Sequence, residues 1–498
     1  MPRRWWSLVA VALATFMTYL DNNVTNVAIP TIQRSLHLSL AGLEWVVSSY
    51  ILVFAGLLLV GGKLADMYGR RRLFFIGLTI FTAASLGAGL AGSGGVLIGM
   101  RLVQGLGAAL LVPTTLAIIV ATFDDIRERT TAIGVWTAIG ALALGFGPLI
   151  GGIISQHLHW GWIFFINVPV GVATLAIAAF AVRESRDTSV ARHLDLPGLA
   201  ASVVALTSLT YALIEGHDRG WTSAPILGAF ALAAAAGVAF TQIEARSARP
   251  MIPLALFRSR VFAGGVGTMM LWAFGIFGIY FFTSIYLQNV LGFSPTRAGL
   301  AFVPMALCMA LFAGAGGPLA ARVGAHRVVA LGLVLDAVGL YLFSRLGVGA
   351  SLASLMPGFL LFGAGSGLMT VPLTNAVLGA MPPEQSGIAS ALLNNSRELA
   401  GLLGITVIGA VLRARQGVAL RHGTAPAPAF LDGYHAGLVV TIGLVVVGAI
   451  AGYAALRHAP RLAPAAVTAA PAAQAAGPDP AAAEVVMDQA GAGRGAKD

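Results

Sequence analysis

The stretch "GGKLADMYGRRR" at positions 61–72 has a weak counterpart, "GGPLAARVGAHR", at positions 316–327. Both begin with two glycines, continue through Leu-Ala and end in a short loop that contains glycine and arginine. Along the chain, the first stretch follows the second apolar segment and its counterpart follows the tenth. This spacing predicts two related halves of six helices each, with two further helices inserted between them.

The composition is that of a membrane protein. Of the 498 residues, 57% are hydrophobic and only 10% are charged, whereas about 25% of the residues in a soluble globular protein are charged. The mean hydropathy is +0.85, and a water-soluble fold of this length could not hide that much apolar surface. The predicted fold class is therefore an all-α polytopic membrane protein, with the lipid bilayer as its surroundings.

Apolar windows of about 20 residues are long enough to cross the hydrocarbon core as helices. The chain offers fourteen such windows, of which the seventh and eighth are the weakest as separate helices. Their predicted bounds are 5–29, 43–65, 73–92, 95–121, 131–155, 161–182, 196–214, 225–244, 261–289, 298–320, 327–346, 352–378, 386–412 and 436–457.

Basic residues set the expected orientation in the membrane. If the N-terminus is cytoplasmic, most of the 30 Lys and Arg residues fall in cytoplasmic segments, where such residues gather in membrane proteins. This bias predicts a multi-pass protein of the cell membrane with both termini in the cytoplasm. It also accounts for the net charge of +10 without a nucleic acid partner.

The predicted spans divide the chain into four parts. Residues 1–182 would form an N-terminal six-helix bundle, residues 183–250 the two inserted helices with their linkers, and residues 251–458 a C-terminal six-helix bundle. Residues 459–498 are rich in Ala and Pro and predict a disordered cytoplasmic tail. The segment 249–260 is typical of a short interfacial helix or, equally well, of a loop.

A carboxylate lies inside the first predicted span. The stretch "YLDNNVTNVAIP" at positions 19–30 places Asp21 near the outer end of that helix, and a charge in hydrocarbon costs on the order of 3 kcal/mol. A helix rises about 1.5 Å per residue, which puts Arg101 of the fourth span at a similar depth. The two could pair, with Gln104 on the same face as Arg101. Alternatively, Arg101 extends its charge outward to water.

Several motifs resemble those of the major facilitator superfamily. The stretch at 61–72 resembles the signature between its second and third helices. "RLVQGLGAALLVP" at 101–113 resembles the fourth-helix motif of proton-coupled members, and "GALALGFGPLIGG" at 140–152 resembles the fifth-helix antiporter motif. "LDNNVTNVAIP", "WGWIFFINVPVG" at 160–171 and "SGIASALLNNSRELAGLLG" at 386–404 are similar to stretches of the fourteen-helix drug:proton antiporter branch.

This resemblance implies roles for two sets of residues. One set would latch a conformation of the transporter, with Arg70 paired to an acid of a neighbouring helix; its members are Gly62, Asp66, Gly69, Arg70 and Asp124. The other set would kink the fifth helix and pack it tightly; its members are Gly147, Pro148, Gly151 and Gly152. The chain departs from the family pattern at Ala143, where Gly is usual, and at Gly161, where Arg is usual.

Two more carboxylates fall within predicted spans, near mid-membrane. Glu398 stands where the family often has Gln, and it could bind a proton or a cationic substrate, or form a static pair with another helix. Arg397 is adjacent, but neighbours on a helix point about 100° apart and need not pair. Asp336 ranks below Asp21 and Glu398, because its helix is peripheral in the family fold. The predicted proton-coupling residues are Asp21, Arg101 and Glu398.

A substrate cavity would be lined by amides and aromatic rings. The ninth span, "MMLWAFGIFGIYFFTSIYLQN", is unusually aromatic, and the resemblance implies that it borders the central cavity. Aromatic side chains can hold flat, apolar or cationic molecules, although packing against lipid or core is the alternative for each of them. The predicted lining residues are Asn22, Asn26, Gln104, Trp272, Phe277, Tyr280, Asn375 and Asn394.

The sequence contains no nucleophile elbow, phosphate-binding loop or metal-ligand spacing. We therefore expect a non-enzymatic protein without cofactor or metal. The resemblance implies a monomeric exporter that exchanges protons for a drug, an antibiotic or another amphipathic or cationic small molecule. A dedicated exporter of one metabolite, lipid or siderophore is the open alternative. A polytopic membrane enzyme is a weaker one, and the Gly147-Pro148 motif speaks against a nutrient importer.

Overall fold

The computed structural model describes residues 2–186, 195–247, 250–382 and 385–459. Every regular element in these ranges is helical, and this confirms the predicted fold class. The tail predicted for residues 459–498 lies outside the described residues except for its first position.

The helices follow one another along the chain in three groups. The first group is α1 (Arg3–Leu36), α2 (Leu40–Tyr68), α3 (Arg70–Gly89), α4 (Gly94–Thr122), α5 (Ile126–His157), α6 (Trp162–Phe165) and α7 (Asn167–Ala181). The inserted helices are α8 (Leu196–Arg219) and α9 (Ala224–Arg246). The last group is the short 3-10 turn η1 (Leu254–Arg258), α10 (Arg260–Ile285) with its π-helical extension η2 (Tyr286–Val290), α11 (Pro295–Val323), α12 (Ala325–Ser344), α13 (Leu352–Gly379), α14 (Ser386–Arg421) and α15 (Pro426–Leu456).

Thirteen helices of the described ranges are long and apolar enough to cross a membrane, counting α6 with α7 and α10 with η2. Helix α1 is not among them, because its Asp and Asn residues lower its mean hydropathy, but its 34 residues run through the core of the first bundle. Together these helices correspond to the fourteen predicted spans. Several extend past the predicted bounds, since a helix that leaves the hydrocarbon can continue in the interface; α14, for example, ends at Arg421.

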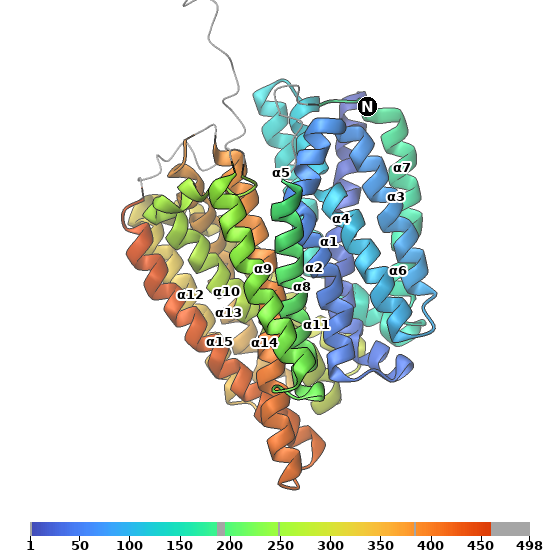
Figure 1. Ribbon diagram of the computed structural model, residues 1–498, viewed down its shortest axis with the longest axis vertical. Coiled ribbons are helices and arrows are strands. Elements are labelled where there is room, and N and C mark those ends of the chain that lie inside the picture. The colour runs from blue at the N-terminus through green and yellow to red at the C-terminus, as the bar shows by residue number, and fades with distance from the viewer. Residues whose placement is uncertain (1, 187–194, 248–249, 383–384, 460–498) are drawn as a thin grey trace, which may run out of the picture.

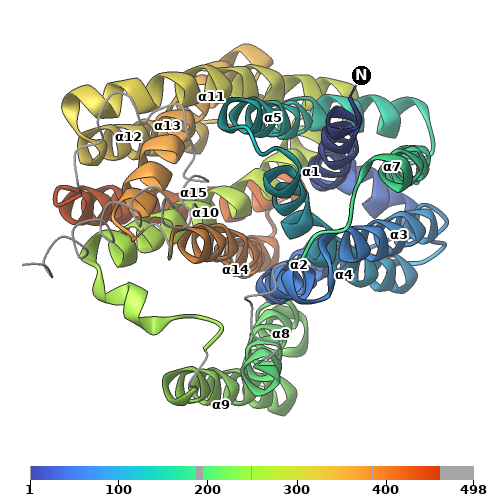
Figure 2. The same ribbon diagram turned by 90° about the horizontal axis from the view of Figure 1, so that it is seen from above.

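The helices form two bundles that meet at a seam (Figures 1 and 2). Helices α1 to α7 pack on one another, and so do α10 to α15. At the seam, α5 packs against α11, α2 against α14, and α1 against α10. The inserted helices α8 and α9 stand outside the bundles as a hairpin, and α8 contacts both α2 and α14 (Figure 2). Helix α15 ends on the side of the molecule where α1 begins (Figure 1).

The repeat in the sequence recurs as paired features of the two bundles. Gly61 and Gly316 hold the same position of the repeat, and each brings its helix against a backbone carbonyl, of α4 in one bundle and of α13 in the other. Gly69 (φ 113°) and Gly324 (φ 94°) then form the turns before α3 and α12, in a backbone region that favours glycine. The two bundles are built on the same local scheme.

Candidate functional site

A buried carboxylate, Asp21 on α1, lies at the centre of a polar cluster inside the first bundle. Arg101 on α4 donates from Nη1 to Asp21 Oδ2 at 2.5 Å, and neither side chain has exposed surface. Gln104, one turn along α4, donates to Asp21 Oδ1 at 3.2 Å. Asn167, the first residue of α7, donates to the same oxygen at 2.9 Å. Donors from two helices therefore surround the acid of a third.

Helices α2 and α3 complete this Asp21 cluster. Arg101 Nε donates to the carbonyl of Val46 at 3.1 Å, and its guanidinium lies 4.3 Å from the centre of the Tyr50 ring. Ser85 on α3 accepts a hydrogen bond from Gln104 at 2.8 Å. Among the described residues, Arg101 Nη2 has no hydrogen-bond partner. In a low-dielectric interior, such a network holds its members in fixed positions, and one donor of the cation stays available.

This geometry decides between the two interpretations of Arg101. Its side chain is fully buried and contacts Asp21, so it does not extend outward to water. The pairing lowers the cost of placing either charge in the membrane. The role of this pair in proton coupling stays a prediction.

Ser85 and Asn167, whose side chains extend the hydrogen bonds of the Asp21 cluster, were not predicted from the sequence. Asn167 lies in the stretch "WGWIFFINVPVG", where it is an isolated amide in an apolar span; such an amide needs a buried partner, and that was the available signal. Ser85 carried no signal, because its hydroxyl also donates to the carbonyl of Phe81 in its own helix, as serines in membrane helices often do.

The second predicted acid, Glu398 on α14, has a close partner. The adjacent Arg397 folds back and donates from Nη2 to Glu398 Oε1 at 2.7 Å. These neighbours do pair, because the long arginine side chain spans the angle between them. Tyr19 on α1 lies near the Arg397 side chain. The two predicted acids, Asp21 on α1 and Glu398 on α14, therefore lie on opposite sides of the seam.

Two of the predicted cavity residues belong to the packed interior, which corrects the prediction for them. Gln104 is fully buried in the Asp21 cluster. Trp272 on α10 is 6% exposed and donates its indole N–H to Asp336 Oδ2 at 3.1 Å. Each carries an N–H group that must find a partner when buried, and in each case a buried carboxylate accepts it.

The other predicted cavity residues are more open. The half-buried ones are Asn22, Asn26, Phe277, Tyr280 and Asn375, and the exposed one is Asn394. The buried Oδ1 of Asn26 has no hydrogen-bond partner among the described residues, so it is a free acceptor. Tyr280 lines a cavity of about 10 Å³ together with Phe302 and Thr283. That volume suits at most one water molecule, so this face of α10 is packed core.

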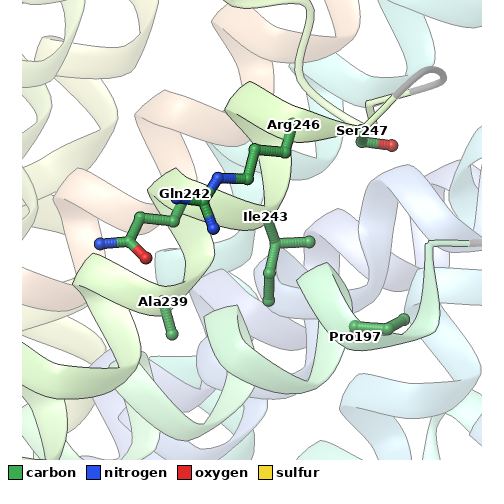
Figure 3. A pocket seen from close by; sticks show the side chains of 6 residues that line it. All are labelled: Pro197, Ala239, Gln242, Ile243, Arg246 and Ser247. Atoms are coloured by element: carbon green, nitrogen blue, oxygen red, sulfur yellow. The ribbon is translucent and has the colours of Figure 1, made fainter.

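A larger pocket lies outside the bundles. It has a volume of about 480 Å³ and lies on the inserted hairpin, lined by Pro197, Ala239, Gln242, Ile243, Arg246 and Ser247 (Figure 3). These residues come from the start of α8 and the end of α9, with the following position. The pocket is remote from the Asp21 cluster, and it is not the central cavity that the resemblance implies.

Asp336 on α12 is fully buried and forms no ion pair with the described residues. Its carboxylate accepts hydrogen bonds from Ser366 Oγ at 3.0 Å and from Trp272 Nε1 at 3.1 Å. The acid therefore ties α12 to α13 and α10, and its partners are neutral.

We expect Asp336→Asn to fold nearly as stably as the parent, because the amide oxygen can still accept from Trp272 and Ser366. Asp336→Ala should destabilise the protein by about 1–3 kcal/mol for each buried donor that is left unpaired. Thermal unfolding of the purified variants in one detergent measures the difference. Equal losses in both variants would contradict this account, since the charge and not the acceptor oxygen would then matter.

Arg70 of the predicted latch has a different partner from the one that the sequence suggested. Arg70 pairs with Asp66 at 2.8 Å, one turn back at the end of α2, and Asp124 forms no ion pair with the described residues. The expected pairing of Arg70 with the Asp124 loop is therefore absent from this conformation. The acid that reaches across is Glu184, which accepts from the backbone N–H groups of Arg71 and Arg72 at the start of α3. Of the remaining members, Gly62 lies in the last part of α2, and Gly69 forms the turn between α2 and α3.

The glycines of the predicted antiporter motif bring α5 close to two partners. Gly147 and Gly151 face α1, where an added Cβ would lie 2.5 Å from Asn23 Cβ and 2.7 Å from Val24 O. Gly152 faces the other bundle and touches the backbone of Pro295 on α11. Pro148 lies within continuous helix, and its carbonyl contacts Gly299 of α11. This helix therefore joins its own bundle and also forms the seam.

The sequence model of the Major Facilitator Superfamily matches residues 11–405. The chain belongs to this superfamily. It is 38% identical over 410 residues to Multidrug resistance protein Stp of Mycobacterium tuberculosis (strain CDC 1551 / Oshkosh), a match that covers 82% of this chain and 76% of that relative. It is 34% identical to Puromycin resistance protein pur8 of Streptomyces alboniger, with 89% of both chains covered. It is also 34% identical to the Tetracenomycin C resistance and export protein of Streptomyces glaucescens, with 83% and 77% covered.

Solved structures of superfamily transporters share the fold. A bacterial homolog of the human lysosomal transporter Spinster, inward-facing and occupied, superposes with a TM-score of 0.67 at 18% identity, covering 92% of this chain and 97% of that one. An auto-inhibited POT family peptide transporter superposes with a TM-score of 0.66 at 17% identity, covering 92% and 98%. At this level of identity the likeness supports the superfamily architecture alone.

Proposed function

We propose that this protein is a proton-coupled exporter of drugs, antibiotics or other amphipathic or cationic small molecules. The observation that carries the proposal is the Asp21 cluster, a fully buried acid and cation inside a membrane-spanning bundle. Intramembrane ionisable groups of this kind are costly and are kept for function. The relatives that are named for multidrug, puromycin and tetracenomycin C resistance support export as the direction.

The proposed cycle is alternating access, in which the bundle of residues 1–182 rocks against the bundle of residues 251–458, with residues 183–250 inserted between them. Both termini would be cytoplasmic, and the protein would work as a monomer in the cell membrane. Hydrogen bonds that cross the seam at the opposite, external end support a state closed to the outside. Gln288 donates to the carbonyl of Val27 at 2.8 Å, and the N–H of Thr296 donates to Gln156 at 3.1 Å.

The proposed coupling step is a competition at Asp21. As an anion, Asp21 holds Arg101, Gln104 and Asn167. A proton from outside would neutralise the carboxylate, weaken its hold on Arg101 and lower the affinity for a cationic substrate. Glu398 on the other side of the seam would be the second acid that senses this change. Substrate would leave outward, and the proton would be released inside.

A dedicated exporter of one compound is the second candidate. Relatives named for a single antibiotic support it, such as the Cephamycin export protein CmcT of Amycolatopsis lactamdurans, which is 36% identical over 406 residues. The two candidates share the same mechanism and differ in the breadth of the substrate site.

A proton-coupled exporter should discharge a pH gradient when its substrate is added. Purified protein in energised inside-out vesicles is screened against many compounds, with a pH-sensitive dye as the readout and empty vesicles as the control. We expect at least one compound to collapse the gradient in proportion to the amount of protein. If compounds are transported but none of them collapses the pH gradient, the coupling ion is not the proton.

A further inference from the structure

A second buried ion pair, apart from the Asp21 cluster, crosses the seam between the bundles. Glu44 on α2 and Arg413 on α14 are in direct contact, and their side chains are 0% and 5% exposed. Gly409, one turn before Arg413, leaves the space that the Glu44 carboxylate fills; a Cβ at that position would overlap it. The pair therefore links two bundles that a rocking mechanism has to separate.

The inserted helix α8 closes over the same pair. Arg413 Nη2 donates to the carbonyls of Leu213 and Ile214 on α8, at 3.3 Å and 3.2 Å. Trp45, next to Glu44 on α2, donates its indole N–H to Glu215 of α8 at 3.0 Å. One turn of α8 thus contacts both sides of the seam, in agreement with its place beside α2 and α14 (Figure 2).

The pair lies at the end of the molecule opposite the N-terminus. Helix α2 begins at Leu40, shortly before Glu44, while α14 and α8 end at Arg421 and Arg219, shortly after Arg413 and Ile214. This is the end where the other hydrogen bonds cross the seam. It is the external end if both termini are cytoplasmic.

Two atoms of the pair are left without a partner. Among the described residues, Glu44 Oε2 and Arg413 Nε are buried and form no hydrogen bond. Water would satisfy both atoms if the seam opened. A buried pair whose polar groups are incompletely satisfied gains hydration when it separates, so it can hold a closed state without making closure permanent.

We infer that Glu44 and Arg413 form an external latch, supported by α8, which holds the bundles closed and must break in every transport cycle. The inference rests on the alternating access of the proposed function. It also gives the inserted hairpin a role, because α8 supplies the carbonyls that hold the Arg413 side chain in reach of Glu44. The two residues are positioning residues for the closed state, and substrate need not touch them.

The latch is tested by the exposure of the seam to an external reagent. Cys308 is the only cysteine, so Cys308→Ser provides a background in which Val27→Cys reports on a fully buried seam position. Intact cells are treated with a membrane-impermeant maleimide, and the labelling rate is measured. We expect Glu44→Gln to raise the rate about tenfold or more, because Arg413 then favours the open, hydrated state.

Control variants separate a latch from a general loss of structure. Glu44→Asp keeps the negative charge but has a shorter side chain, so its labelling rate should be intermediate. This variant serves as the test if Glu44→Gln does not fold. Glu128→Gln removes an ion pair with Arg4 inside the first bundle and should leave the rate unchanged.

Unchanged labelling in both Glu44→Gln and Glu44→Asp would overturn the latch. The labelling rate requires neither a proton gradient nor a known substrate. The latch can therefore fail while the exporter assignment stands, and loss of proton coupling in the vesicle assay would leave the labelling result intact.

Discussion

Asp21→Asn is expected to reduce gradient-driven export to background while the protein stays folded. The amide cannot take up a proton in the relevant range, so the step that trades a proton for substrate is lost. Its oxygen still accepts from Arg101, and Arg101 keeps the Val46 carbonyl, Gln104 and the Tyr50 ring as partners. These remaining contacts limit the cost of removing one charge from a buried pair.

The measurement compares two kinds of transport in the same vesicles. Uphill export against a substrate gradient requires the proton and should disappear in Asp21→Asn. Exchange of labelled for unlabelled substrate requires no net proton movement and should continue, but at higher substrate concentrations, because the neutral side chain binds a cationic substrate more weakly. Normal uphill export and normal proton exchange in this variant would show that Asp21 is a structural acid.

Arg101→Ala should have the larger effect on stability, with a loss of about 3–5 kcal/mol. The substitution leaves the Asp21 carboxylate buried without a cation, and it removes the guanidinium from the Tyr50 ring. Arg101→Lys should recover only part of the loss, because one ammonium group cannot replace the separate contacts of Nε and Nη1 with Val46 and Asp21.

A double-mutant cycle measures how much of this loss belongs to the ion pair. Asp21→Asn combined with Arg101→Ala removes both charges, so the double variant should be more stable than the sum of the single losses predicts. Thermal unfolding in detergent and the yield of monodisperse protein are the readouts. Additive losses would indicate that the two residues stabilise the bundle through separate contacts.

Features that follow one helix or one local repeat could be predicted from the sequence. Spans follow from apolar length, and the repeat at 61–72 and 316–327 predicted two similar halves. The depths of Asp21 and Arg101 follow from the rise of a helix, and this was enough to suggest that they meet. Helix ends were less predictable, because α14 continues past the apolar window to Arg421.

Contacts that depend on how one helix is rotated against another could not be predicted. Glu44 and Arg413 are far apart in the chain, and no periodicity indicates that their helices face each other. Trp272 was expected to face a cavity, but α12 supplies Asp336 on that side and the indole is buried. Arg70, at the start of α3, pairs with Asp66, four residues earlier at the end of α2. The flexible arginine side chain reaches this acid more readily than an acid in a loop.

Helix α5 makes two neighbouring positions respond differently to substitution. Gly151 and Gly152 are consecutive, but successive residues on a helix point about 100° apart, so one touches α1 of its own bundle and the other touches α11 across the seam. A bulky side chain at position 151 would disrupt the packing of α5 against α1 inside the first bundle, which moves as one body in the proposed cycle. The same side chain at position 152 would separate α5 from α11 of the other bundle, the two bodies that the proposed cycle moves against each other. Substitutions at these two adjacent positions should therefore differ in effect. The variant at position 151 should fail to accumulate in the membrane, whereas the variant at position 152 should accumulate but transport slowly.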